Sequence, residues 1–434
     1  MAKSRSNGNR NANKPTDAKL LGNAYIRAVN RATVLDLFRN GKQLSRSDIS
    51  RQCDLTKPTV SAIVDSLVAE GVLKEAGMGP SDGGRRALLL EINPISSTFV
   101  GIHFGEDTTQ IAVTDALGRT LAKKTADTVS ENPDASMETA RVLVNDALRD
   151  ANLDMSHVTA AGVSVPGLVD RQTGNCKIAP NLGWHDYPIS ERLAALLGVD
   201  VYVANTTQTA ALAEHQMGVA RGLQNFVWLY VGSGVGSCAV IGGRIQLGTR
   251  GFAGEIGHCK VETPGLLCGC GKRGCLETTC SNLAIAREAR KAIESGRPTA
   301  LAFARKPVCA KDVSLAASEG DMVAQKIMTD AGRALGLGVS LLLNIYDPQM
   351  VVVGGPVAGT DDFFLDGLKK QAAKYSLETP GAKIVFSNLG SDIYLKGAVQ
   401  MAMEKSNASY RIIKSAKTME VEEDEWVYAK GSRL

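Results

Sequence analysis

The 434-residue chain is predicted to be an α/β protein that begins with a winged helix-turn-helix. Three observations predict this class. Residues 20–92 contain three helix-like segments followed by two short apolar runs, which is the order of a winged helix-turn-helix. From Phe99 onward, candidate strands alternate with candidate helices, as in α/β proteins. His258 and the three cysteines at positions 268, 270 and 275 lie within 18 residues, which indicates a metal site in this second part.

The first helix is predicted over residues 23–40, because apolar side chains recur there at helical spacing until Gly41 stops the pattern. The preceding residues 1–19 are polar and basic, rich in Asn, Ser and Lys. A segment of this composition buries little apolar surface, so a disordered basic tail is expected there.

The second and third helices are predicted from their end signals. Ser45 can cap a short helix, with Asp48 three residues later. Thr56 begins the third helix with Pro58 in its first turn, and Gly71 ends it. These helices complete a domain predicted to span residues 20–92.

The wing of this domain is predicted from apolar runs at residues 72–73 and 87–92, which flank the turn-rich stretch GMGPSDGGRR. The N-terminal part of the chain is also basic. Residues 1–92 hold 15 Lys and Arg against 9 Asp and Glu, net +6, and the remaining 34 against 36 give −2. This asymmetry fits a nucleic-acid-binding module joined to another domain, and equally a solvated basic tail.

DNA contacts are expected from the N-terminal half of the third helix, which enters the major groove in helix-turn-helix proteins, and from the second wing strand. Short polar side chains can bond to base edges, and arginines can reach phosphates or the minor groove. The candidate DNA-binding residues are Thr56, Lys57, Thr59, Ser61, Arg85 and Arg86.

Strands and helices alternate through the rest of the chain. The predicted strands are 99–103, 110–114, 160–165, 201–204, 226–231, 237–241, 350–353 and 383–386. The predicted helices include 135–151, 189–197 and 323–344.

Membrane and secreted classes are not expected. No run approaches the ~20 apolar residues of a membrane span, and no apolar signal core follows the basic N-terminus. Nine cysteines, an odd number in a chain of this length, favour a reduced compartment with metal ligands over a disulfide scaffold. A cytoplasmic protein with no membrane partner is therefore expected.

The cysteine-rich stretch predicts a structural zinc site. His258, Cys268, Cys270 and Cys275 supply one imidazole and three thiolates, a donor set suited to Zn²⁺. Four good ligands leave no open position for catalysis, so a structural ion is predicted. The other six cysteines show no ligand spacing and are expected to act as small hydrophobic residues.

This stretch, GEIGHCKVETPGLLCGCGKRGCLE, resembles the signature of the ROK family of repressors and sugar kinases. The segments GVSVPGLVD, NLGWHDYPISERLAALLGVDVYVAN, VGSGVGSCAVIGGRIQLGTRGFAGEIGH and NIYDPQMVVVGG are also similar to the family. The resemblance implies two ribonuclease H-like, actin-type lobes, here residues 97–205 and 206–405. It also implies a last helix that packs back on the first lobe, followed by a tail over residues 406–434. The repressor branch adds a winged helix, as predicted here.

The resemblance separates kinases from sugar-sensing regulators at two places. Kinases of the family use the Asp of an Asn-Asp pair as general base, and the matching pair here is Asn205-Thr206. A threonine does not accept a proton near neutral pH. Their first phosphate loop, Gly-x-Asp-x-Gly-Gly-Thr, corresponds to GIHFGED, where His103, Glu106 and Asp107 are substituted. An acidic pair there would repel a triphosphate, so no catalytic residues and no enzyme activity are expected.

The sugar side of the family pattern is kept. Glu255, His258 and Glu277 match the positions that bond to sugar hydroxyls, with Asn205 beside them. In the kinases the Asp that is Thr206 here also contacts sugar, so a vestigial pocket stays an alternative.

Together these features predict a ROK-family regulator, a repressor of sugar-uptake or catabolic genes. A sugar or sugar-derivative effector would change its affinity for double-stranded operator DNA. The resemblance also implies a homodimer or homotetramer. Two alternatives stay open: a bifunctional sugar kinase with a DNA-binding head, and a ligand-independent DNA-binding protein with a vestigial cleft.

Overall fold

The computed structural model describes residues 16–38, 41–80, 86–304, 307–356, 362–377 and 383–406. The chain divides into two compact units, one up to Ser96 and one from Ser97 to Met403. The first unit contains the predicted helix-turn-helix, and the second is the predicted α/β part. Within the described ranges, no helix is both long and apolar enough to cross a lipid bilayer.

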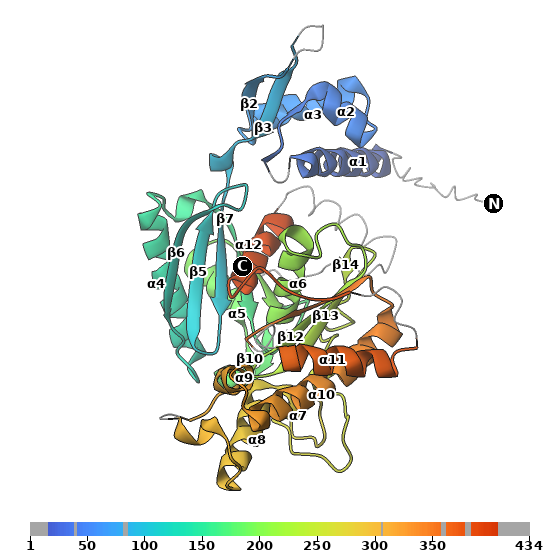
Figure 1. The fold of residues 1–434 in the computed structure, drawn as a ribbon. Helices are drawn as coiled ribbons and strands as arrows, with labels where there is room; N and C mark the ends of the chain where they lie inside the picture. Colours follow the sequence, from blue (N-terminus) through green and yellow to red (C-terminus); the bar gives the residue numbers. More distant parts are fainter. Residues whose placement is uncertain are drawn as a thin grey trace, which may run out of the picture. The chain divides into compact units, whose positions relative to one another are not determined.

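The first unit is a winged helix-turn-helix domain (Figure 1). Its helices are α1 (Thr16–Leu37), α2 (Arg46–Cys53) and α3 (Lys57–Ala69). Its antiparallel sheet has the order β1 (Leu44–Ser45), β3 (Leu88–Ile92), β2 (Leu73–Met78). Apolar side chains from the helices and the sheet form one core, made of Val34, Phe38, Leu44, Ile49, Val60, Val64, Leu67, Leu73 and Leu90.

The predicted end signals of α2 and α3 are confirmed. The Ser45 hydroxyl accepts a hydrogen bond from the Asp48 N–H at 3.2 Å, and the Asp48 carboxylate accepts from the Ser45 N–H at 3.1 Å. At the start of α3, the Thr56 hydroxyl accepts from the Thr59 N–H at 3.4 Å. Gly71 follows α3 with φ +74°, a conformation that glycine adopts without strain.

Helix α1 begins earlier than the sequence pattern predicts. It starts at Thr16, so residues 16–19, which we expected in the disordered tail, are helical. The reason is that the segment TDAKLL contains no residue that breaks a helix, although it has no clear apolar spacing. Residues 1–15 of the expected tail, and all of the expected C-terminal tail beyond Ser406, lie outside the described residues.

The second unit contains two five-stranded mixed sheets, each the centre of one lobe. The first sheet has the order β11 (Asp200–Asn205), β7 (Val158–Val165), β4 (Thr98–Phe104), β5 (Thr108–Thr114), β6 (Thr120–Asp127). Strands β11, β7 and β4 are parallel, whereas β4, β5 and β6 form an antiparallel meander. A small sheet follows, of order β10 (Trp184–Tyr187), β9 (Cys176–Ala179), β8 (Leu168–Val169).

The second sheet has the order β14 (Arg244–Ile245), β13 (Val235–Ile241), β12 (Phe226–Val231), β15 (Met350–Gly354), β16 (Lys383–Phe386). Strands β12, β15 and β16 are parallel, and β12–β13–β14 is antiparallel. Its outer face packs against helices, which are α7 (Glu277–Cys280), α8 (Asn282–Glu294), α9 (Ala310–Ser318), α10 (Met322–Tyr346) and α11 (Asp362–Tyr375). The outer face of the first sheet is covered by α4 (Pro133–Asp150) and α5 (Ile189–Leu197).

Two helices, α6 (Thr206–Met217) and α12 (Ile393–Ser406), form a layer between the sheets (Figure 1). Each sheet can contribute to two cores, because alternate side chains of a strand point to opposite faces of the sheet. On β12, Val227 and Leu229 join the outer core of the second lobe, whereas Phe226 and Trp228 join the middle core with α6 and α12.

Close approach of α12 to the first sheet depends on glycine. A Cβ atom on Gly162 of β7 would lie 1.9 Å from the Ala398 carbonyl oxygen of α12. A Cβ on Gly397 would lie 1.9 Å from the Thr209 carbonyl oxygen of α6. The absent side chains therefore allow α12 to pack against both the first sheet and α6.

Candidate functional site

The N-terminal end of α3 presents part of the predicted DNA-binding set. Thr56 and Lys57 are exposed, and Thr59 and Ser61 are partly exposed. The Thr56 and Thr59 hydroxyls lie 2.8 Å apart and hydrogen-bond to each other, and the Thr56 hydroxyl also caps the helix. The Lys57 ammonium is therefore the charged group of this set available to a phosphate.

An arginine that the sequence reasoning missed connects the two helices of the motif. The Arg46 guanidinium, in the first turn of α2, lies 2.7 Å from the Asp65 carboxylate and donates to the Ser61 carbonyl at 3.2 Å. The available signal was its place directly after the cap residue Ser45. In the wing, Arg86 is exposed, while Arg85 lies outside the described residues.

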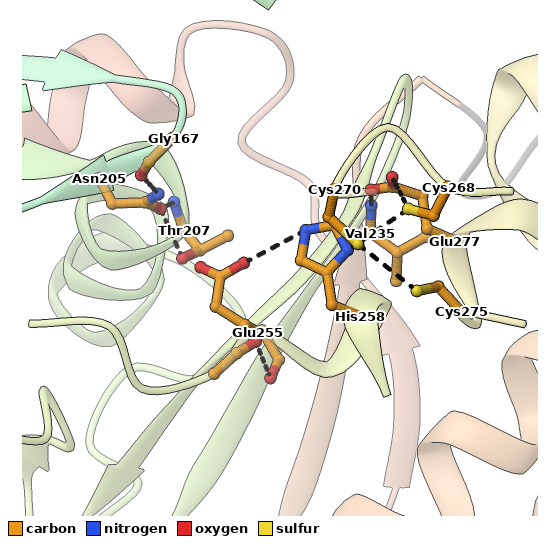
Figure 2. Close-up of polar contacts among 12 residues, drawn as sticks. Gly167, Asn205, Thr207, Val235, Glu255, His258, Cys268, Cys270, Cys275 and Glu277 are labelled. Carbon is orange, nitrogen blue, oxygen red and sulfur yellow. Dashed lines mark hydrogen bonds and ion pairs between the residues drawn. The ribbon is translucent and has the colours of Figure 1, made fainter. Parts of the chain in front are cut away.

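The predicted metal ligands come together in the second lobe. The ligand atoms of His258, Cys268, Cys270 and Cys275 all lie within 4.8 Å of one another (Figure 2). The Cys270 and Cys275 sulfurs are 3.7 Å apart, as are the Cys268 sulfur and His258 Nδ1. Two thiolates bound at 2.3 Å in a tetrahedron would be about 3.8 Å apart, so the cluster fits a structural metal site of the zinc type.

The loop that carries the cysteines turns tightly because of its glycines. The Cys268 N–H donates to the Lys272 carbonyl at 2.7 Å, and the Gly271 N–H donates to the Cys268 carbonyl at 2.9 Å. Gly271 and Gly274 have φ of +82° and +81°. A Cβ at Gly274 would also lie 2.1 Å from the Glu262 carbonyl oxygen, so only glycine fits there.

The expectation about the remaining cysteines is partly wrong. Cys176, Cys238 and Cys280 are buried, and burial raises the pKa of the Cys176 thiol to about 12. Cys259 and Cys309, however, are exposed: Cys259 directly follows the 3₁₀ helix Ile256–His258, and Cys309 directly precedes α9.

His258 connects the metal cluster to the predicted sugar-binding residues. Its Nδ1 atom faces Cys268, and its Nε2 atom lies 3.9 Å from the Glu255 carboxylate. Figure 2 shows the Glu255 carboxylate between this imidazole and the turn at Asn205 and Thr207. Burial, and to a smaller extent the nearby Glu277, raises the pKa of Glu255, while His258 opposes the shift.

Glu277, at the start of α7, is already hydrogen-bonded within the protein. One carboxylate oxygen accepts from the Val235 N–H at 3.1 Å, and the other lies 3.5 Å from the Cys268 sulfur. It therefore connects the metal loop to the turn that precedes β13.

Asn205 caps α6 at the end of β11. Its side-chain oxygen accepts from the Thr207 N–H and hydroxyl, both at 2.7 Å, and its amide donates to the Gly167 carbonyl. The Asn205 amide is therefore held rigidly in one orientation beside Thr206, the first residue of α6.

The positions predicted to distinguish a kinase also have defined contacts. His103 is buried, lies 3.3 Å from the Ser164 carbonyl oxygen through Nδ1 and stacks on Tyr394 with ring centroids 4.9 Å apart. Burial lowers the pKa of His103 to about 4, so the ring is neutral near pH 7. Asp107 is exposed, whereas Glu106 bonds to Asn181 and Ser233, two partners that sequence reasoning missed.

The described residues define a winged-helix protein with a two-lobed α/β body and a His–Cys₃ cluster. Comparison with known families identifies the family to which this class of protein belongs. Residues 99–405 match the model described as the ROK family, and residues 28–77 match the IclR helix-turn-helix domain. The chain belongs to the ROK family, and both the predicted resemblance and the predicted fold of a winged helix followed by two actin-like lobes are confirmed.

Similar proteins match most of the chain. A protein named putative xylose repressor, from Caldicellulosiruptor sp. strain Rt8B.4, is 30% identical over 88% of this chain and 98% of its own length. The N-acetylglucosamine repressor of Escherichia coli O6:H1 is 27% identical over 80% of this chain and 86% of its own. A crystal structure of a ROK family transcriptional regulator, titled a homolog of E. coli MLC protein, has TM-score 0.79 and 24% identity, covering 90% of this chain and 100% of that chain.

Proposed function

We propose that the protein is a transcriptional repressor whose winged helix binds operator DNA and whose lobes bind a sugar or sugar derivative. One observation carries the proposal: the chain joins a winged helix to a kinase-like body that keeps Glu255 and His258 together but has Thr206 at the base position. The names of the xylose and N-acetylglucosamine repressors support regulation of sugar genes. A cytoplasmic location follows from the proposed DNA target.

A non-enzymatic role is supported by the site that a kinase would need. Thr206 offers a hydroxyl of high pKa where a carboxylate would accept the sugar proton. His103 is a buried neutral imidazole where the family kinases place an aspartate, so it offers no negative charge to a metal–triphosphate complex. Glu106 adds a negative charge at the neighbouring turn.

The sugar site we propose consists of Asn205, Glu255, His258 and Glu277. The Glu255 carboxylate and the His258 imidazole are each more than a third exposed, so both can reach a ligand. A carboxylate accepts two hydroxyl hydrogen bonds, and its charge strengthens them. Asn205 and Glu277 are bonded to backbone groups, so we assign them mainly to positioning, with a ligand contact through their remaining lone pairs.

A structural Zn²⁺ held by His258, Cys268, Cys270 and Cys275 would fix this site. The ion would orient the His258 ring through Nδ1 and leave Nε2 for the ligand, so zinc supplies rigidity rather than chemistry. The same loop holds Glu277 through Cys268, which couples two of the proposed sugar residues to the metal.

On the DNA side, Thr56, Lys57, Thr59 and Ser61 would face the major groove, and Arg85 and Arg86 would reach phosphates or the minor groove. We propose a homodimer or homotetramer, because paired half-sites require two winged helices. The effector would act by population shift: it binds two lobe arrangements with different affinity and thereby changes operator affinity.

The test is fluorescence anisotropy of the full-length protein on labelled DNA from upstream of its own gene, with competitor DNA at near-physiological salt. D-xylose, N-acetylglucosamine, glucose and their phosphates are then titrated into the complex. We expect one of them to change operator affinity in the native protein and to lose this effect in Glu255→Gln, which should keep its basal DNA binding.

Two results would contradict the proposal. Absence of specific DNA binding would remove the repressor function altogether. Formation of ADP together with a phosphorylated sugar by the native protein would instead support the alternative of a bifunctional kinase with a DNA-binding head.

A further inference from the structure

Two turns from different lobes meet at the Glu106 carboxylate. Glu106 lies in the turn between β4 and β5 of the first lobe, and Ser233 lies in the turn between β12 and β13 of the second. The Ser233 hydroxyl donates a hydrogen bond to Glu106 Oε1. The Asn181 amide, from the 3₁₀ helix Pro180–Leu182 of the first lobe, donates to the same oxygen at 2.6 Å and lies 3.4 Å from the Ser233 hydroxyl.

Both turns are held by backbone hydrogen bonds, so the contact joins ordered segments. The Gly105 N–H donates to the Thr108 carbonyl at 2.9 Å in the first turn. In the second, the Gly232 N–H donates to the Gly234 carbonyl at 2.9 Å, and the Gly232 carbonyl accepts from the Asn282 N–H at 2.7 Å. A Cβ on Gly232 would lie 2.0 Å from the Tyr230 hydroxyl oxygen, so that ring packs directly on the turn.

The groups behind the carboxylate are aromatic and uncharged near pH 7. Tyr230 and Tyr394 meet edge to face with centroids 6.2 Å apart, and Tyr394 stacks on His103. Burial, with a smaller effect of the Glu106 charge, raises the pKa of Tyr230. The Tyr230 hydroxyl also interacts with Ser233, so the turn is surrounded by neutral donors and aromatic rings. A carboxylate bonded to neutral donors makes charge-assisted hydrogen bonds, which are stronger than those between neutral groups.

We propose that Glu106 is an inter-lobe latch, which holds the first lobe to the turn at Ser233. Glu106 and Ser233 lie in turns of different lobes, so the contact can form only when the two lobes approach each other. A ligand that moves the lobes apart must therefore break this contact, whereas a ligand that leaves the lobes together keeps it. The latch thus sets the fraction of molecules whose lobes are held together, and an effector shifts this fraction. The latch does not depend on which effector binds.

Hydrogen–deuterium exchange of the full-length protein without ligand tests the latch, because it measures local opening of each turn. In Glu106→Ala we expect the Gly105 and Gly232 amides to exchange about tenfold to a hundredfold faster, the effect of losing hydrogen bonds to a charged group. Ser233→Ala should accelerate the same two amides, although the substitution lies in the other lobe.

Asp107→Ala is the matched control, because it removes the adjacent exposed carboxylate. It should leave both turns unchanged, and the amide of the buried Trp228 on β12 should stay equally protected in all variants. If Glu106→Ala does not fold, Glu106→Gln, which keeps one acceptor oxygen, should give a smaller acceleration in the same turns.

Three results would overturn the latch. The first is exchange at Gly232 that is unchanged in Glu106→Ala, the second is acceleration confined to the lobe that carries the substitution, and the third is an equal effect of Asp107→Ala. None of these measurements uses DNA or sugar, so failure of the latch is distinct from failure of the proposed repressor function.

Discussion

The Nε2 atom of His258 lies 3.9 Å from the Glu255 carboxylate, while Nδ1 of the same ring faces the Cys268 sulfur at 3.7 Å. A single imidazole therefore belongs to both the metal cluster and the proposed sugar site. Because metal binding would fix both the tautomer and the ring orientation of His258, occupancy of the cluster would determine which nitrogen of the ring the proposed sugar site can use.

Replacement of Cys268 by Ser should remove the metal and destabilise the second lobe. We expect less than one zinc per chain by elemental analysis and a free energy of unfolding lower by about 3 kcal/mol or more, because metal binding contributes directly to folding. Cys259→Ser is the control, since Cys259 is exposed and outside the cluster. Native protein prepared without chelator that contains no zinc would refute the site.

The acid stability of the protein should depend on His103. Its pKa is about 4 in the folded state and about 6.5 when unfolded, so the unfolded chain binds more protons between these values. The free energy of unfolding should therefore fall as the pH decreases from about 6.5 to 4, by up to about 3 kcal/mol from this residue. Well above pH 6.5, where the histidine is neutral in both states, it contributes no slope.

Denaturant unfolding across this pH range measures the slope. His103→Gln should flatten it, whereas His157→Gln, at an exposed histidine, should not. A slope that is identical in native protein and His103→Gln would show that other groups cause the acid sensitivity.

Lys57→Ala should weaken DNA binding by about the same factor on the operator and on other DNA sequences. Lys57 is exposed at the start of α3, and loss of one phosphate contact reduces the salt dependence, the slope of log K against log salt, by about 1. Lys326→Ala on α10 removes the same charge from the other unit and should have no such effect. The measurement is anisotropy at several salt concentrations, and an unchanged slope in Lys57→Ala would place this lysine outside the interface.

Gly162→Ala should destabilise the body by more than about 3 kcal/mol, because the added methyl would overlap the Ala398 carbonyl of α12. Gly79→Ala is a suitable control, since a Cβ there meets its nearest neighbour at 3.4 Å. Thermal unfolding of the two variants gives the comparison. An equal Tm in native protein and Gly162→Ala would mean that α12 is not tightly packed on the first sheet.

The sequence predicted the helices whose ends are determined by capping residues and glycines close by in the chain. Ser45, Thr56 and Gly71 set the ends of α2 and α3 through contacts within a few residues, so the sequence was sufficient there. The predicted bounds of β12, β16 and α5 also agree with the structure. In contrast, α6 was missed because residues 208–214 are all buried between two sheets, which erases the one-sided pattern of a surface helix.

The candidate site also has a part that the sequence predicted and a part that it did not. The metal ligands were predictable because three of the four lie within eight residues and their donor chemistry is specific. The contact of Glu106 with Ser233 was not, because it depends on how two sheets are placed by α6 and α12. From sequence, Glu106 was recognisable only as a charge that would repel phosphate.

The packing of α12 against β4 and β7 has a consequence for the order in which the protein is made. The core of the winged helix uses residues 34–90 alone, so this module can be complete early in synthesis. The two-lobed unit cannot, because Val399 of α12 fills the space over Gly101 of β4. During synthesis the winged helix can therefore fold before α12, which the two-lobed unit needs for its packing, has emerged from the ribosome.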